Sequence, residues 1–137
     1  MRGLGIIAIA LFLTVGNLIQ NGGFEEGLEG WRDLWTRDPG VGGVVLDDRT
    51  RHSGRFSARI EHKGGRDWSF DPEISIDVRP GDLFELEAWV RIEGKGRTTL
   101  CVVTYDEEGK VLKWVYAGRS AYGPCGWRHL TSRFAVP

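Results

Sequence analysis

The sequence predicts an all-β fold, a two-sheet antiparallel β-sandwich of the jelly-roll type. Apolar and polar residues alternate with a period of two in several segments, as they do in strands that have one buried face. No segment after residue 16 has the apolar spacing of an amphipathic helix. The chain has 20 Gly in 137 residues, and turn sequences separate the strands at intervals of about eight to twelve residues.

The N-terminal residues have the order of an export signal. Arg2 supplies positive charge, and residues 4–15 form an uncharged apolar run that ends near Gly16. The run is shorter than the roughly 20 residues that a bilayer-spanning helix needs, so we expect a helical signal peptide, residues 1–16, to be cleaved. The mature protein, residues 17–137, would then be secreted or held at the cell surface. An uncleaved anchor is the alternative, because Gly is less typical than Ala at the cleavage position.

Several strands are expected after the signal. Residues 42–46 and 55–61 predict the first two, and residues 73–78 predict a third. Pro80 and Gly81 then form a turn, since Pro fixes φ and Gly accepts the conformations that close a corner. We expect the strand after this turn to pair antiparallel with the strand before it.

The strand Leu83–Ile92 has the clearest alternation. One face carries Glu85, Glu87 and Trp89 and is expected to meet solvent. Residues 126–136 predict the last strand, with three apolar residues in phase. The residues expected to point into the core from these two strands are Phe84, Leu86, Ala88, Val90, Leu130, Phe134 and Val136.

Residues 98–105 and 111–116 predict a hairpin, because a short turn that contains glycine separates them. Leu112, Trp114 and Tyr116 share one face of its second strand. This face either fills the core or presents two rings to solvent, and the alternation is compatible with both.

Charge and cysteine content limit the possible partners. The formal net charge is −1, without the basic surplus of nucleic-acid binders, so no nucleic acid is expected as a partner. Export would allow Cys101 and Cys125 to form a disulfide worth about 3 kcal/mol, and two unbonded thiols are the alternative. Two cysteines are too few ligands to make a zinc site.

A series of short motifs resembles a known family. In chain order they are NLIQNGGFE at 17–25, GW at 30–31, HSGRFS at 52–57, VRPG at 78–81, AWVR at 88–91, GW at 126–127 and FAVP at 134–137. Together they resemble the carbohydrate-binding modules of the cellulose- and xylan-binding type, in the galactose-binding-like jelly-roll group. The resemblance implies two stacked sheets, non-catalytic sugar binding and attachment to polysaccharide-degrading enzymes.

In that family a further pair of strands follows the last motif, and this sequence ends there. We therefore expect an incomplete sandwich, a fragment whose catalytic or surface domain lies downstream. The resemblance also places a calcium-binding carboxylate at Glu25. Calcium takes six to eight oxygens, and the backbone of residues 51–54 is the expected second source. A solvated Glu25 is the alternative.

Aromatic rings are the candidate sugar contacts, because sugars present apolar C–H faces ringed by hydroxyls. Arg66 and Trp68 resemble an Arg and a Trp that contact ligand in xylan-binding relatives. Packing in the core or under a loop is the alternative for each ring. The predicted carbohydrate-binding residues are Trp68, Arg66, Trp114, Tyr116, Trp89 and Tyr105.

The sequence thus predicts a non-catalytic module that binds a polysaccharide of the β-glucan or xylan type and tethers a secreted carbohydrate-active protein to it. The expected partners are polysaccharides or oligosaccharides, with no membrane contact after signal cleavage. A structural or adhesive sandwich of a cell-surface protein is the main alternative. A small jelly-roll glycoside hydrolase is a weaker one, because Glu85 and Glu87 have a carboxylate spacing that any exposed strand offers.

Overall fold

The computed structural model describes residues 2–5 and 16–137, and it consists of strands and turns. No helix occurs in this part of the chain, which confirms the predicted all-β class. Nothing described there provides a helix with the length and apolar content that a membrane crossing requires. The strands are β1 (Arg2–Gly5), β2 (Trp35–Thr36), β3 (Gly42–Asp47), β4 (Ser57–His62), β5 (Trp68–Ser69), β6 (Ile76–Asp77), β7 (Leu83–Ile92), β8 (Arg97–Tyr105), β9 (Val111–Tyr122) and β10 (Cys125–Ala135).

The strands belong to two compact units. Unit 1 contains the described part of Met1–Ile19 together with Ile74–Pro137, and unit 2 contains Gln20–Glu73. The described N-terminal residues, Arg2–Gly5, form strand β1 of unit 1. The rest of the predicted signal helix, residues 1 and 6–15, lies outside the described residues.

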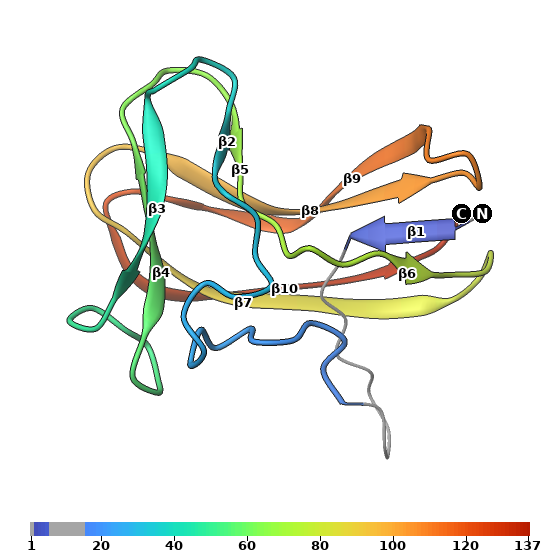
Figure 1. The fold of residues 1–137 in the computed structure, drawn as a ribbon, viewed down its shortest axis with the longest axis horizontal. Helices are drawn as coiled ribbons and strands as arrows, with labels where there is room; N and C mark the ends of the chain where they lie inside the picture. The colour runs from blue at the N-terminus through green and yellow to red at the C-terminus, as the bar shows by residue number, and fades with distance from the viewer. Residues whose placement is uncertain (1, 6–15) are drawn as a thin grey trace. The chain divides into compact units, whose positions relative to one another are not determined.

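Unit 1 is a sandwich of two antiparallel sheets. One sheet has the strand order β6-β1-β8-β9 and the other pairs β10 with β7, and Figure 1 shows β8 and β9 in one layer with β7 and β10 in the other. Apolar side chains from both layers meet between them. Within the sheet of β7 and β10, Phe84 stacks on Phe134 at a centroid distance of 5.5 Å. The buried residues of this core are Val78, Leu86, Val102, Phe134 and Val136.

The alternation predicted for β7 is confirmed. Leu86 is buried in the core, whereas the side chains of Glu85 and Glu87 lie on the opposite face. There they contact β10: Arg133 Nε donates to Glu85 at 2.6 Å, and His129 Nε2 lies 2.9 Å from Glu87. In the pairing register Arg133 faces Glu85 directly. His129 faces Trp89, so its contact with Glu87, two residues along β7, is diagonal.

The pairing expected at the Pro80-Gly81 turn is wrong. The short strand β6 pairs with β1, and β7 pairs with β10. Pro80 has no N–H to donate, and the N–H of Gly81 donates to the carbonyl of Val136 at 2.9 Å. The backbone carbonyl of Asp82 accepts a hydrogen bond from the N–H of Val136 at 2.8 Å. The turn therefore directs the chain toward β10 rather than back along β6.

Unit 2 contains two short antiparallel pairs, β3 with β4 and β2 with β5. The expected strands at 42–46 and 55–61 correspond to β3 and β4. In an aromatic cluster Trp31 contacts Phe24 and Phe70, at centroid distances of 5.0 and 4.8 Å, and the two phenylalanine rings lie 6.2 Å apart. The indole N–H of Trp31 donates to the carbonyl of Asn21 at 3.1 Å, so Trp31 has the packing role of a structural residue.

The packing of β7 leads to a stability prediction. We expect Leu86→Ala to lower the free energy of unfolding by about 2–5 kcal/mol, because it leaves a cavity between the sheets. Leu83 lies on the same strand and is 78% exposed, against 3% for Leu86. Leu83→Ala should therefore change stability by less than about 0.5 kcal/mol. Urea denaturation of both variants measures this, and equal losses would contradict the described core.

Candidate functional site

The hairpin of β8 and β9 positions the clearest candidate site. Asp106 closes its turn: the carboxylate accepts hydrogen bonds from the backbone N–H of Glu108 at 3.0 Å and of Lys110 at 2.8 Å. Gly109 takes a φ of 81°, a conformation that favours glycine. The turn therefore fixes where β9 starts relative to β8.

Burial on β8 determines which way the hairpin faces. Val102 and Thr104 are fully buried in unit 1, so the alternating residues Cys101, Val103 and Tyr105 lie on the opposite face of the strand. In the antiparallel register Trp114 pairs with Val103. Directly paired residues of antiparallel strands point to the same side of the sheet.

Tyr116 likewise pairs with Cys101, so the rings of Tyr105, Trp114 and Tyr116 share the outer face of this sheet. Trp114 is 56% exposed and Tyr116 is 69% exposed, whereas Tyr105 is half-buried. We call these three rings the ring face. The alternative that Leu112, Trp114 and Tyr116 fill the core is wrong, because Leu112 is also exposed.

A family model described as "Carbohydrate binding domain" matches residues 16–137. The chain belongs to this family. No curated protein and no solved structure matches it. The match confirms the predicted resemblance, and it includes the whole of β8 and β9. A carbohydrate-binding domain acts by binding, which favours a non-catalytic role for this part of the protein.

Trp89 of the carbohydrate-binding domain lies on the other sheet of unit 1. Its indole is 46% exposed and stacks on the imidazole of His129, with centroids 4.6 Å apart and planes 8° from parallel. The core of unit 1 lies between this surface and the ring face. The structure therefore brings Tyr105, Trp114 and Tyr116 together but separates Trp89 from them.

Arg66 and Trp68 belong to unit 2 of the domain. Trp68 is half-buried on β5 and pairs with Thr36 of β2. The guanidinium of Arg66 forms a close ion pair with Asp38, and this contact lowers the pKa of the Asp38 carboxyl. The side chain of Arg66 is thus oriented by an acidic neighbour, and a sugar contact for it stays a prediction.

Trp35 is a further exposed ring, which the sequence pattern does not indicate as a sugar contact. It is half-exposed on β2, and the guanidinium of Arg37 lies over its ring at 5.5 Å. Arg37 also pairs with Asp67 at 2.8 Å. Exposure of this ring depends on a two-residue strand, which gives no alternation for a sequence pattern to detect.

The carboxylate of Glu25 is engaged by Arg55. Its Oε1 accepts a hydrogen bond from the backbone N–H of Arg55 at 2.7 Å, and its Oε2 accepts one from Nε of the same arginine at 3.0 Å. The carbonyls of Asp48 and Gly54 accept hydrogen bonds from the Arg51 side chain. Throughout residues 2–5 and 16–137 no three His, Cys, Asp or Glu side chains gather as metal ligands. Calcium at Glu25, with ligands from the backbone of residues 51–54, stays a prediction.

The carboxylates that a hydrolase would use are engaged in contacts between strands. Glu85 pairs with Arg133 and Glu87 with His129, so each carboxylate is bound to a basic side chain. Cys101 and Cys125 are unbonded thiols, and burial raises the pKa of Cys101. A thiol with a raised pKa carries little nucleophilic thiolate, which disfavours cysteine chemistry at this site.

The contacts of Glu25 predict a pH-dependent effect on stability. The hydrogen bonds from Arg55 lower the pKa of Glu25 from its ordinary value of 4.5. A lowered pKa in the folded state gives stability that is present above 4.5 and is lost as the pH falls through the lowered pKa.

We therefore expect Glu25→Gln to lower the melting temperature more at pH 7 than at pH 2. The neighbouring exposed Glu26 makes no described side-chain contact, so Glu26→Gln should leave the melting temperature unchanged at both pH values. Thermal melts in EGTA measure this without a metal contribution. A Glu25→Gln deficit that is as large at pH 2 as at pH 7 would contradict the role of the carboxylate.

Proposed function

We propose that this domain binds a β-linked polysaccharide of the glucan or xylan type along the ring face. The observation that carries the proposal is the outward exposure of Trp114 and Tyr116 on one strand face of a carbohydrate-binding domain. An exposed indole is costly to hydrate and is favoured where a ligand covers it.

The spacing of the rings favours a chain over a single sugar. Residues two positions apart on a strand are separated by about 7 Å, so Trp114 and Tyr116 present successive platforms. A ligand that contacts both must be extended and must repeat its apolar face. The hydroxyls of Tyr105 and Tyr116 would then hydrogen-bond to sugar hydroxyls beside the stacking rings.

Such binding would tether a secreted carbohydrate-active protein to its substrate. Binding through one module converts the encounter of a linked domain into an intramolecular event, which raises its effective concentration. The export-like order of residues 1–16 supports secretion. The domain itself would hold the polysaccharide and carry out no bond cleavage.

The proposal predicts that Trp114→Ala weakens binding of soluble xylan or β-glucan by about tenfold or more, as loss of an aromatic platform does. Leu112 lies two residues before Trp114 on β9 and is similarly exposed but has no ring. Leu112→Ala is therefore the control and should retain most of the affinity. Both variants should melt at the temperature of the unsubstituted protein, because neither side chain is in the core.

Isothermal titration calorimetry with xylan, β-glucan and mannan compares the variants. Unchanged affinity of Trp114→Ala, or equal losses in both variants, would contradict stacking at the ring face. If none of the three polymers binds the unsubstituted protein, the structural or adhesive alternative replaces the proposal.

A further inference from the structure

A second surface of unit 1 has the features of a ligand site that is separate from the ring face. It is a pocket of about 460 Å³ between the end of β9 and the start of β10. The residues that line it are Arg119, Ser120, Ala121, Tyr122, Pro124, Cys125, Arg128, His129 and Leu130.

Two interruptions of the strand ladders build this pocket. Thr98 of β8 pairs with Ala121 of β9, and Leu100 pairs with Ala117. Residues 118–120 of β9 therefore bulge opposite the single residue Thr99. On β10 the register shifts between Cys125 and Arg128. Bulges redirect side chains and are frequent next to binding sites. Here they turn Arg119 and Arg128 to the same pocket.

Gly118 holds the first bulge close to β10. It has a φ of 76°, and a Cβ at this position would lie 2.7 Å from the carbonyl oxygen of Thr131. Only glycine fits both the conformation and the close approach. The bulge is therefore a specified feature of the sequence rather than a loose strand end.

The charge of the pocket is unbalanced. Arg119 and Arg128 make no ion pair with any residue in the described ranges, and the lining contains neither Asp nor Glu. Elsewhere in these ranges some arginines have acidic partners and others, such as Arg49, Arg79 and Arg97, form no ion pair, so what distinguishes Arg119 and Arg128 is that they line one pocket together. The paired arginines are Arg32, Arg37, Arg55, Arg59, Arg66, Arg91 and Arg133.

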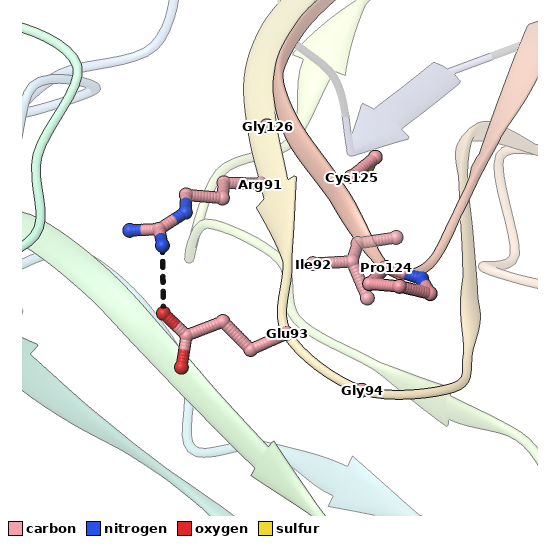
Figure 2. A pocket seen from close by; sticks show the side chains of 7 residues that line it. All are labelled: Arg91, Ile92, Glu93, Gly94, Pro124, Cys125 and Gly126. Carbon is pink, nitrogen blue, oxygen red and sulfur yellow. Dashed lines mark ion pairs between the residues drawn. The ribbon is translucent and has the colours of Figure 1, made fainter.

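The neighbouring pocket provides a direct comparison. It shares Pro124 and Cys125 with the pocket between β9 and β10 and is also lined by Arg91 and Glu93, which form an ion pair at 3.0 Å (Figure 2). Its arginine is thus neutralised by the chain itself. The pocket of Arg119 and Arg128 has no such internal partner, so an anionic ligand is favoured there.

The remaining lining groups favour a sugar over a simple anion. Tyr122 is exposed and offers a ring for stacking, and the hydroxyl of Ser120 offers a hydrogen bond. We propose that this pocket binds an acidic pyranose unit, a hexuronate, with its carboxylate on Arg119 and Arg128 and its apolar face on Tyr122. Guanidinium groups suit this role because they match a carboxylate with two parallel hydrogen bonds.

For a polymer ligand the inference rests on the proposed glycan binding, since the hexuronate would be a unit or side group of the same chain. It adds a ligand class, acidic polysaccharide, to the neutral backbone expected at the ring face. Binding at the pocket should weaken with salt, whereas stacking at the ring face should not.

The experiment uses the full chain and one matched pair of ligands. These are a xylo-oligosaccharide substituted with glucuronic acid and the same compound after reduction of its carboxyl to a hydroxymethyl group. Calorimetry at low salt should show tighter binding of the acidic form. Arg119→Gln and Arg128→Gln should each lower its affinity by about tenfold and leave that of the reduced form unchanged.

Arg79→Gln is the control, because Arg79 is exposed in unit 1, has no described ion pair and lies outside the pocket. It should leave the affinity for the acidic form unchanged. Tyr122→Ala should weaken binding of the acidic sugar, and sulfate at equal ionic strength should compete poorly.

Equal affinity for the acidic and reduced ligands, or an equal loss in Arg79→Gln, would overturn the inference. Full competition by sulfate together with no effect of Tyr122→Ala would also overturn it, since the pocket would then bind anions rather than an acidic sugar. Trp114→Ala separates the two proposals. If the ring face binds no glycan, Trp114→Ala keeps its affinity while the Arg119 and Arg128 variants still lose affinity for the acidic ligand. If the pocket binds no hexuronate, the arginine variants keep their affinity while Trp114→Ala still loses it.

Discussion

Burial of Val102 between the two sheets of unit 1 is the constraint on which the candidate site depends. Val102 is fully buried in the core beside Leu86 and Phe134. Because side chains alternate along a strand, this burial places Tyr105 on the opposite face of β8. The pairing register then carries Trp114 and Tyr116 to the same face. Exposure of the rings is thus a consequence of how the core is packed.

The same core separates two outward surfaces of different chemistry. The sheet of β8 and β9 presents aromatic rings, whereas the sheet of β7 and β10 presents paired charges beside the stacked Trp89 and His129. Glu87 lies within hydrogen-bond distance of His129 across the strands, at 2.9 Å. The ring face is the more apolar of the two and is better suited to stacking on a neutral glycan.

Sequence patterns predicted β7 with its bounds, because the alternation over Leu83–Ile92 is uninterrupted. They did not decide whether Trp114 is exposed, since Leu112 has the same phase and the answer depends on the opposite face of β8. They also ended the second hairpin strand at Tyr116, because Gly118 and its bulge break the alternation. The pocket beyond that point, with Arg119, was missed for the same reason.

Sequence patterns also could not predict contacts between residues that are distant in the sequence, because these contacts depend on the strand register. His129 has no acidic residue near it in sequence, and only the register of β7 with β10 brings Glu87 within hydrogen-bond distance. Likewise, the contact of Glu25 with Arg55 joins residues 30 positions apart, and no local pattern indicates it.

Hydroxyl-radical footprinting with and without a xylan oligosaccharide tests the central claim most directly. Trp114 and Tyr116 should be oxidised rapidly in the free protein, whereas Trp31, which packs in an aromatic cluster, should be oxidised slowly. Saturating sugar should protect the first two rings and leave the rate at Trp31 unchanged. Slow oxidation of Trp114 and Tyr116 in the free protein, or no protection by bound sugar, would contradict a ring face that binds glycan.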